Sequence, residues 1–274
     1  MPSHESAGTS ANHPFDRTIA LSVLGECRYG AAARPDYWNL TGPFGGATAA
    51  MLLNSALIAP NRLGDPVALT VNFAAPMAKE AYEVNTGASR TNRSTQHWNI
   101  ELTQNANTIA TASAVFALRR ESWHRSEIAM PDELPSAQSL GVLDRAAPMP
   151  WFKHYDLRPI RTVGSTRDPQ VCTHAWIRDE PARALDFPAL AAICDTVMPW
   201  MFRRRKEMIP VSTVSLSVYF HVSSAELASV GSEHVYTRSY GQICHSGFMD
   251  SNAQVWSRAG ILLATTQQMM WVKE

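Results

Sequence analysis

Two seven-residue stretches of the chain alternate apolar and polar residues in the same way. Val67–Phe73 reads VALTVNF and Val214–Phe220 reads VSLSVYF, so both follow V-x-L-x-V-x-F. Strict alternation is the period of a β-strand with one buried face. The two stretches therefore predict equivalent strands in two halves of one repeated chain.

A second pair of stretches supports the repeat. Thr108–Phe116 reads TIATASAVF and Leu262–Met270 reads LLATTQQMM, and both have a small apolar-Ala-Thr centre. Each follows a strand-like stretch and a polar turn, TQNAN in the first half and WSRAG in the second. They predict a late strand in each half.

An apolar segment precedes each V-x-L-x-V-x-F strand. These segments are Gly45–Pro60 (GGATAAMLLNSALIAP) and Ala189–Phe202 (ALAAICDTVMPWMF). Ala, Leu and Met dominate both, which favours helix. The order of elements is then helix, strand, strand, strand, twice. A central apolar helix wrapped by an antiparallel sheet is the hot-dog fold, so we predict an α+β double hot dog.

Composition divides the chain further. Residues 1–14 resemble a short disordered tail. Residues 122–149 are rich in Pro, Ser and charge, which suits a linker between a first repeat at 15–121 and a second repeat at 150–274. Two strand-like runs, WFKHYDLRPI and QVCTHAWIRD, open the second repeat.

Charge and motifs narrow the function. Lys plus Arg equals Asp plus Glu, 24 each, which argues against a nucleic-acid binder. No apolar run has the roughly 18 residues of a membrane span, no signal peptide is evident, and the four cysteines form no CxxC pair. We expect a cytoplasmic protein. The histidines lack metal-ligand spacing and there is no GxSxG or P-loop, so we expect no metal or cofactor.

Asp195 is the one charge in the second apolar segment. A carboxylate in apolar surroundings is costly unless hydrogen bonds hold it. Pro199 has no N–H for the Asp195 carbonyl four residues earlier, so the helix should kink or end near Asp195.

Four motifs resemble those of one family: GPFGGATAA, ICDTVMPW, VSTVSLSVYFH and ATTQQMMW. The chain resembles the bacterial acyl-CoA thioesterase II group and its thioesterase-like relatives from about Asp16 to Lys273. The resemblance implies a double hot dog, a thioester hydrolase of lipid metabolism, and a catalytic trio of Asp195, Thr213 and Gln268. Gln267 is the alternative third member.

The trio suits hydrolysis of a thioester. Asp195 can orient a water molecule and accept its proton. Thr213 and Gln268 are neutral donors that can hold the carboxylate and the same water. By alternation Thr213 shares a face with Ser215, away from the Val/Leu/Phe face. It reaches the helix only if the strand begins with a bulge or in a loop.

Five residues are candidates for substrate binding. Phe44, Gly45 and Gly46 enter the first helix, where glycine permits close approach of an acyl group and the helix N-terminus offers N–H donors to the second-half site. Met198 and Trp200 suit an acyl pocket, although flexible Met suits an ordinary core as well. The run at 202–208, FRRRKEM, is typical of a solvated loop, with contact to coenzyme A phosphates as the alternative.

The repeat predicts one active site per chain. Alignment places Pro66 opposite Thr213 and Ala114 opposite Gln268, and the only side-chain amide of the first helix is Asn54. The expected substrate is acyl-CoA or a carrier-protein acyl thioester; whether the chain forms a homo-oligomer stays open. One alternative is a hot-dog hydratase or dehydratase, which usually relies on an Asp–His pair, although neither apolar helix contains a histidine. The other is a non-enzymatic acyl-thioester or lipid binder.

Overall fold

The computed structural model describes residues 13–39, 42–143, 149–160, 172–205 and 209–273. Most of the predicted tail, residues 144–148 of the predicted linker and residues 206–208 of the basic run lie outside these ranges. Within the described ranges, no helix has the length and apolar character needed to cross a membrane.

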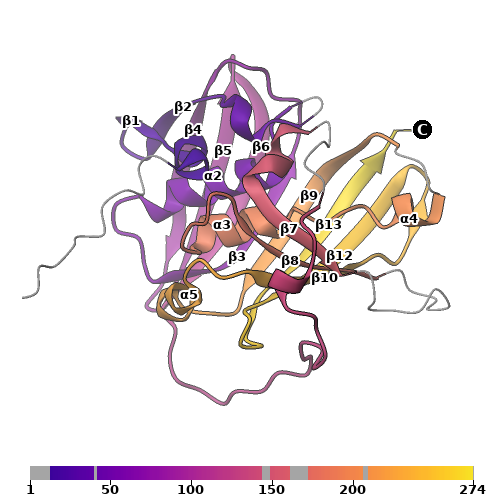
Figure 1. The fold of residues 1–274 in the computed structure, drawn as a ribbon. Coiled ribbons are helices and arrows are strands. Elements are labelled where there is room, and N and C mark those ends of the chain that lie inside the picture. The colour runs from indigo at the N-terminus through magenta and orange to yellow at the C-terminus, as the bar shows by residue number, and fades with distance from the viewer. Residues whose placement is uncertain (1–12, 40–41, 144–148, 161–171, 206–208, 274) are drawn as a thin grey trace, which may run out of the picture.

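The described strands form one 13-stranded antiparallel sheet (Figure 1). Its order is β1-β2-β4-β5-β6-β3-β9-β13-β12-β10-β8-β7, and β11 pairs with β12. The first-half strands are β1 (Ser22–Gly25), β2 (Arg28–Ala32), β3 (Asp65–Phe73), β4 (Ala81–Thr91), β5 (Thr95–Gln104) and β6 (Asn107–Ala117). The second-half strands are β7 (Tyr155–Ile160), β8 (Cys172–Asp179), β9 (Val211–Phe220), β10 (Val235–Tyr240), β11 (Cys244–His245), β12 (Phe248–Trp256) and β13 (Leu262–Val272).

The two halves meet at β3 and β9, and the strand order is mirrored about this pair. Thr70 pairs with Ser217, and their hydroxyl oxygens lie 3.0 Å apart. Both residues are the fourth position of V-x-L-x-V-x-F. A local two-fold axis that relates the repeats therefore passes between Thr70 and Ser217.

The helices supply the core on one side of the sheet. Those described are α1 (Pro14–Ile19), α2 (Gly45–Leu57), α3 (Phe187–Ile193), α4 (Met201–Arg205) and α5 (Ser224–Val230), with 3-10 turns at Pro35–Tyr37, Ala137–Ser139 and Pro150–His154. The two central helices α2 and α3 pack against each other (Figure 1). Most of their side chains are buried, which explains why both segments can be almost uncharged.

The double hot dog is confirmed, with two corrections to its elements. The segment Ala189–Phe202 is not one helix, because α3 ends at Ile193 and α4 begins at Met201. The end near Asp195 agrees with the expectation drawn from Pro199. Each central helix is also followed by four main strands rather than the predicted three. The strands that the sequence analysis did not predict are β4 and β10.

Each repeat carries a bulge at the same place. Val67 has no partner in the ladder between β3 and β6, and Val214 has none in the ladder between β9 and β13. These residues open the two V-x-L-x-V-x-F motifs. Beyond the bulges, Pro66 lies opposite Phe116 and Thr213 lies opposite Met270, so the alignment of the repeats made from sequence holds in the structure.

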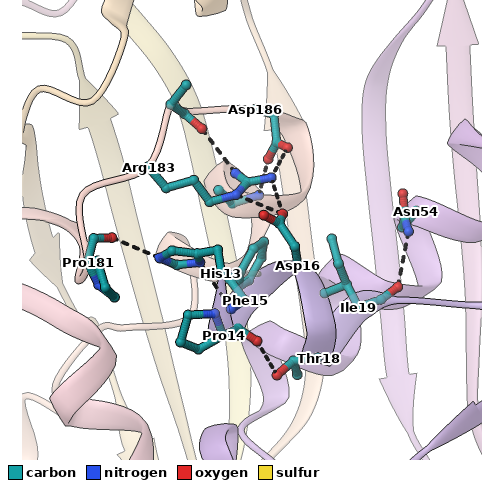
Figure 2. A network of polar contacts seen from close by, with 12 residues as sticks. His13, Pro14, Phe15, Asp16, Thr18, Ile19, Asn54, Pro181, Arg183 and Asp186 are labelled. Atoms are coloured by element: carbon teal, nitrogen blue, oxygen red, sulfur yellow. Dashed lines mark hydrogen bonds and ion pairs between the residues drawn. The ribbon is translucent and has the colours of Figure 1, made fainter. Parts of the chain in front are cut away.

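The short helix α1 ties the start of the chain to both repeats (Figure 2). Arg183 makes ion pairs with Asp16 and Asp186, the N-cap of α3. The Asn54 side-chain amide of α2 donates to the Ile19 carbonyl over 3.1 Å. α1 begins at Pro14 with His13 as its N-cap, so these last two residues of the predicted tail take part in a helix.

Asn54→Ala is expected to weaken this attachment without touching the chemistry. The change leaves the Ile19 carbonyl without its donor, which typically costs about 1 kcal/mol, or roughly 2–4 °C in Tm for a protein of this size. Thermal unfolding and thioester hydrolysis should be measured together. Loss of turnover by a variant that folds and binds normally would assign Asn54 a chemical role and contradict this interpretation.

Candidate active site

Asp195 lies two residues beyond the C-terminal end of α3. Its backbone N–H donates to the Ala192 carbonyl over 3.0 Å, and Thr196 closes the same turn with its N–H and its hydroxyl on the Ile193 carbonyl. The chain then continues without regular secondary structure from Thr196 to Pro199. The turn fixes where the Asp195 side chain departs from the core.

The first turn of α2, from the other repeat, lies against this carboxylate. The Gly46 backbone N–H hydrogen-bonds to Asp195. A Cβ atom added at Gly45 would lie 2.8 Å from Oδ2 of Asp195, and one at Gly46 would lie 2.6 Å from the Ala192 carbonyl oxygen. Glycine is therefore required at both positions for the end of α3 to approach the start of α2 this closely. The first-half glycines therefore lie against the second-half carboxylate, and Gly46 donates to the carboxylate itself.

Burial raises the pKa of Asp195 to about 7, and the Gly46 hydrogen bond opposes part of that rise. The residue as a whole keeps partial solvent access. The carboxylate also lies between two helix ends of opposite polarity, because the C-terminal end of α3 disfavours negative charge and the N-terminal end of α2 favours it. A carboxyl group with a pKa near neutrality can exchange a proton with bound water under ordinary conditions.

Gln268 reaches the same place from β13. Its Nε2 donates to the Cys194 carbonyl over 3.1 Å, so it holds the residue immediately before Asp195. The Gln268 side chain is almost fully buried, and its Oε1 has no hydrogen-bond partner in the described structure. Gln267 is exposed on the opposite face of the sheet. The geometry therefore favours Gln268 over Gln267.

The bulge at Val214 turns Thr213 towards the inner face. Directly paired residues point to the same side of a sheet, and Thr213 pairs with the buried Met270. It therefore shares a face with Gln268, although simple alternation places it on the other. In the described ranges no hydrogen bond joins Thr213 to Asp195 or Gln268.

Two further polar residues lie on this inner face and were not predicted from the sequence. Ser251 pairs with Gln268 across β12 and β13, and Thr266 precedes Gln268 by one inward position. Both are almost fully buried, and the Thr266 hydroxyl has no partner among the described residues. We call Thr213, Ser251, Thr266 and Gln268 the polar patch. Thr266 could have been found from the sequence, because it lies two residues before Gln268 and strand alternation places both on the same face.

The predicted substrate-binding residues fall in three settings. Gly45 and Gly46 contact Asp195, as described above. The Phe44 ring is buried and stacks on Trp151 with centroids 4.3 Å apart, so it belongs to the core. Met198 packs at the margin of the main core, and the Trp200 indole N–H donates to the Asp250 carbonyl over 2.8 Å. In the basic run, Arg203 donates to the Cys172 carbonyl.

Two family profiles match this chain. The family profile for the acyl-CoA thioesterase N-terminal domain matches residues 34–117, and the profile for the C-terminal domain matches residues 131–272. The chain belongs to the acyl-CoA thioesterase family. No curated protein matches it.

Solved structures of similar shape share the fold of this chain. A conserved protein of unknown function with a hot-dog fold from Alicyclobacillus acidocaldarius is 40% identical, with a TM-score of 0.90 over 96% of this chain and 98% of that one. A tesB protein of Mycobacterium avium subspecies paratuberculosis is 18% identical, with a TM-score of 0.78 over 95% and 98%. The acyl-CoA thioesterase II TesB2 of Mycobacterium marinum is 17% identical, with a TM-score of 0.75 over 94% and 98%. At these lower identities the likeness supports the fold.

Gly45→Ala is expected to displace the Asp195 carboxylate, because the new methyl group would lie 2.8 Å from Oδ2. A misplacement of about 1 Å can cost roughly 100-fold in rate, so we expect kcat to fall by about 10- to 100-fold. The matched control is Gly87→Ala in β4, where an added Cβ meets nothing within 4 Å. Equal kinetics for the two variants would contradict the close contact.

Asp195→Asn is expected to stabilise the protein above neutral pH. The pKa of Asp195 is about 7 in the folded protein and near 4 in an unfolded chain. Between about pH 4 and pH 7 the folded state therefore binds a proton that the unfolded state has released. The free energy of unfolding of the wild type falls as the pH rises through this range. The amide avoids this loss, and a Tm rise of roughly 2–4 °C at pH 8 would correspond to about 1 kcal/mol.

The gain should shrink towards pH 4, where the wild-type carboxyl group is protonated. Asp132→Asn, at an exposed linker position, is the control for removal of a charge. A Tm change in Asp195→Asn that is independent of pH, or a loss of stability at pH 8, would show that Asp195 is not held as described.

Proposed function

We propose that this chain hydrolyses acyl-CoA to the free acid and coenzyme A, with Asp195 as the base that activates water. The observation that carries the proposal is the desolvated carboxylate of Asp195 against the first turn of α2, with a pKa of about 7. Family membership supports the reaction class. A base of this pKa is half ionised near neutral pH and still basic enough to accept a proton from water.

The reaction we infer balances without another reactant. Asp195 takes a proton from water as the water oxygen bonds to the thioester carbon. The carbonyl oxygen becomes an oxyanion. In the first turn of α2 the Gly46 N–H donates to Asp195, and the Ala47 and Thr48 N–H groups donate to the Phe44 carbonyl, so the Gly45 N–H is the donor suited to stabilise the oxyanion. The C–S bond then breaks, the carbonyl re-forms, and the proton passes from Asp195 to the departing sulfur.

Thr213 and Gln268 are proposed to position the water and the turn that carries Asp195. Gln268 acts through the Cys194 carbonyl, and its free Oε1 can accept a hydrogen bond from the attacking water. Thr213 lies one strand away on the same face. The equivalent first-half positions hold Pro66 and Ala114, which have no side-chain donor, so we propose one hydrolytic site per chain.

The surroundings of Asp195 favour hydrolysis over hydration. Hot-dog hydratases usually combine Asp with His, and no ion pair or hydrogen bond joins a histidine to Asp195 within the described ranges. A binder without turnover would need no carboxylate at this desolvated position. Screening short, medium, long and aromatic acyl-CoAs for hydrolysis by the wild type is the direct test of the activity.

Replacement of the three residues should give graded losses. Asp195→Asn is nearly isosteric but accepts no proton, so turnover should fall by about 100-fold or more. Thr213→Val and Gln268→Ala should each cost less, about 10-fold, and their double variant should lose less than the product, because they act on one water. Gln267→Ala is the matched control on the outer face and should stay near wild type. Full turnover by Asp195→Asn, or a larger loss from Gln267→Ala than from Gln268→Ala, would contradict the assignment.

A further inference from the structure

The apolar side chains on the inner face of the second repeat form two separate groups. The main core includes Leu216, Val218 and Leu263. A second group consists of Met201, Met249, Met270 and Val272, and we call it the methionine cluster. Trp200, Phe202, Ile209 and Val211 are partly buried against it.

The polar patch lies between these two groups. Along β13 the buried inward positions run from Ala264 in the main core through Thr266 and Gln268 to Met270 and Val272. Successive inward residues are about 7 Å apart, and Thr213 lies directly opposite Met270. The methionine cluster therefore begins one side chain away from the proposed chemistry.

The chain that follows Asp195 covers the cluster. It runs from the active-site turn to α4, which contributes Met201. Trp200 is docked by its indole hydrogen bond to the Asp250 carbonyl, and a Cβ at Gly241 would overlap the indole ring. This short segment separates the cluster from solvent and is joined to the sheet through Trp200 and Arg203.

The central helices border Asp195 on another side. Ala49, Ala50, Leu190 and Ala191 of the central helices are completely buried, which indicates dense packing between α2 and α3. The methionine cluster is more adaptable than the packing between these helices, because unbranched thioether side chains rearrange easily around an apolar ligand. Met270 is the next inward residue after Gln268 along β13.

We propose that the methionine cluster binds the acyl chain of the substrate, which is therefore an unbranched acyl thioester of medium length. This inference rests on the hydrolysis proposed above. The inward row from Gln268 to Val272 spans about 13 Å at roughly 3.3 Å per residue. Each C–C bond is about 1.5 Å long, but it advances an extended zigzag alkyl chain by somewhat less than that. About ten bonds of such a chain therefore fit in this length.

Wild-type protein should be assayed with straight-chain acyl-CoAs from acetyl to palmitoyl, and with a branched and an aromatic acyl-CoA. Each buried methylene contributes about 0.8 kcal/mol, so kcat/KM should rise about fourfold per carbon until the cluster is filled, and then level off or fall. The branched and aromatic substrates should be poorer than the straight chain of equal carbon number. A flat profile, or a preference for aromatic substrates, would overturn the inference.

Variants at Met249 test the location. This side chain is fully buried, pairs with Met270 and does not belong to the polar patch. Met249→Phe should lower the ratio of kcat/KM for decanoyl-CoA over butyryl-CoA by at least tenfold, the effect typical of one misfitted methylene. Met249→Ala should move the optimum to longer chains. Met201→Phe on α4 provides the same test if Met249→Phe does not fold.

The matched control is Met51→Ala, which makes the same truncation at an equally buried methionine of α2 in the first repeat. Its chain-length profile should match the wild type. If the wild type hydrolyses no acyl-CoA, both proposals fail. If it hydrolyses acyl-CoA but the Met249 and Met201 variants keep the wild-type profile, or Met51→Ala shifts it equally, the methionine cluster is not the acyl site and the hydrolase assignment stands.

Discussion

The contact between the Asp195 carboxylate and the first turn of α2 is the constraint on which the rest of the site depends. A desolvated carboxylate at the negative end of α3 is costly, and the Gly46 N–H from the other repeat partly offsets that cost. The approach needs Gly45 and Gly46, because a side chain at either would collide with Asp195 or with the Ala192 carbonyl. The raised pKa of the carboxylate follows from this incomplete compensation.

The same contact explains why two unequal repeats share one chain. The repeats have the same strand order, the same bulge and a common junction at Thr70 and Ser217, but their side chains have diverged where the chemistry is proposed. The second repeat supplies Asp195, Thr213 and Gln268. The first supplies backbone N–H groups and close packing. Neither half contains all of these parts, so joining them in one sheet assembles the site.

The predictable parts of this structure are those set by local periodicity. Alternation located β3 and β9, the shared apolar-Ala-Thr centre located β6 and β13, and the repeat itself indicated the double hot dog. The length of α3 was overestimated because an apolar composition continues past Ile193, while the turn at Asp195 is fixed by backbone hydrogen bonds. β4 and β10 lack the paired motifs that revealed β3, β6, β9 and β13.

The sequence indicates residues of the candidate site but not their contacts. The family resemblance pointed to Asp195, Thr213 and Gln268, and the need for a bulge at Thr213 could be stated in advance. The partner of Asp195 could not, because the Gly46 N–H comes from 149 positions earlier in the chain, and no local pattern encodes how two helices pack. Ser251 and Thr266 look like ordinary strand residues until the pairing of β12 with β13 places them beside Gln268.

The pH dependence of kcat/KM tests the central claim most directly. With an acyl-CoA that the wild type hydrolyses, measured from about pH 5 to pH 9, the account predicts a rise controlled by one group with its midpoint near 7, the pKa of Asp195. The residual rate of Asp195→Asn should lack that midpoint. A wild-type midpoint near 4, or the same midpoint near 7 in the Asn variant, would contradict the claim that a desolvated Asp195 carboxylate is the base.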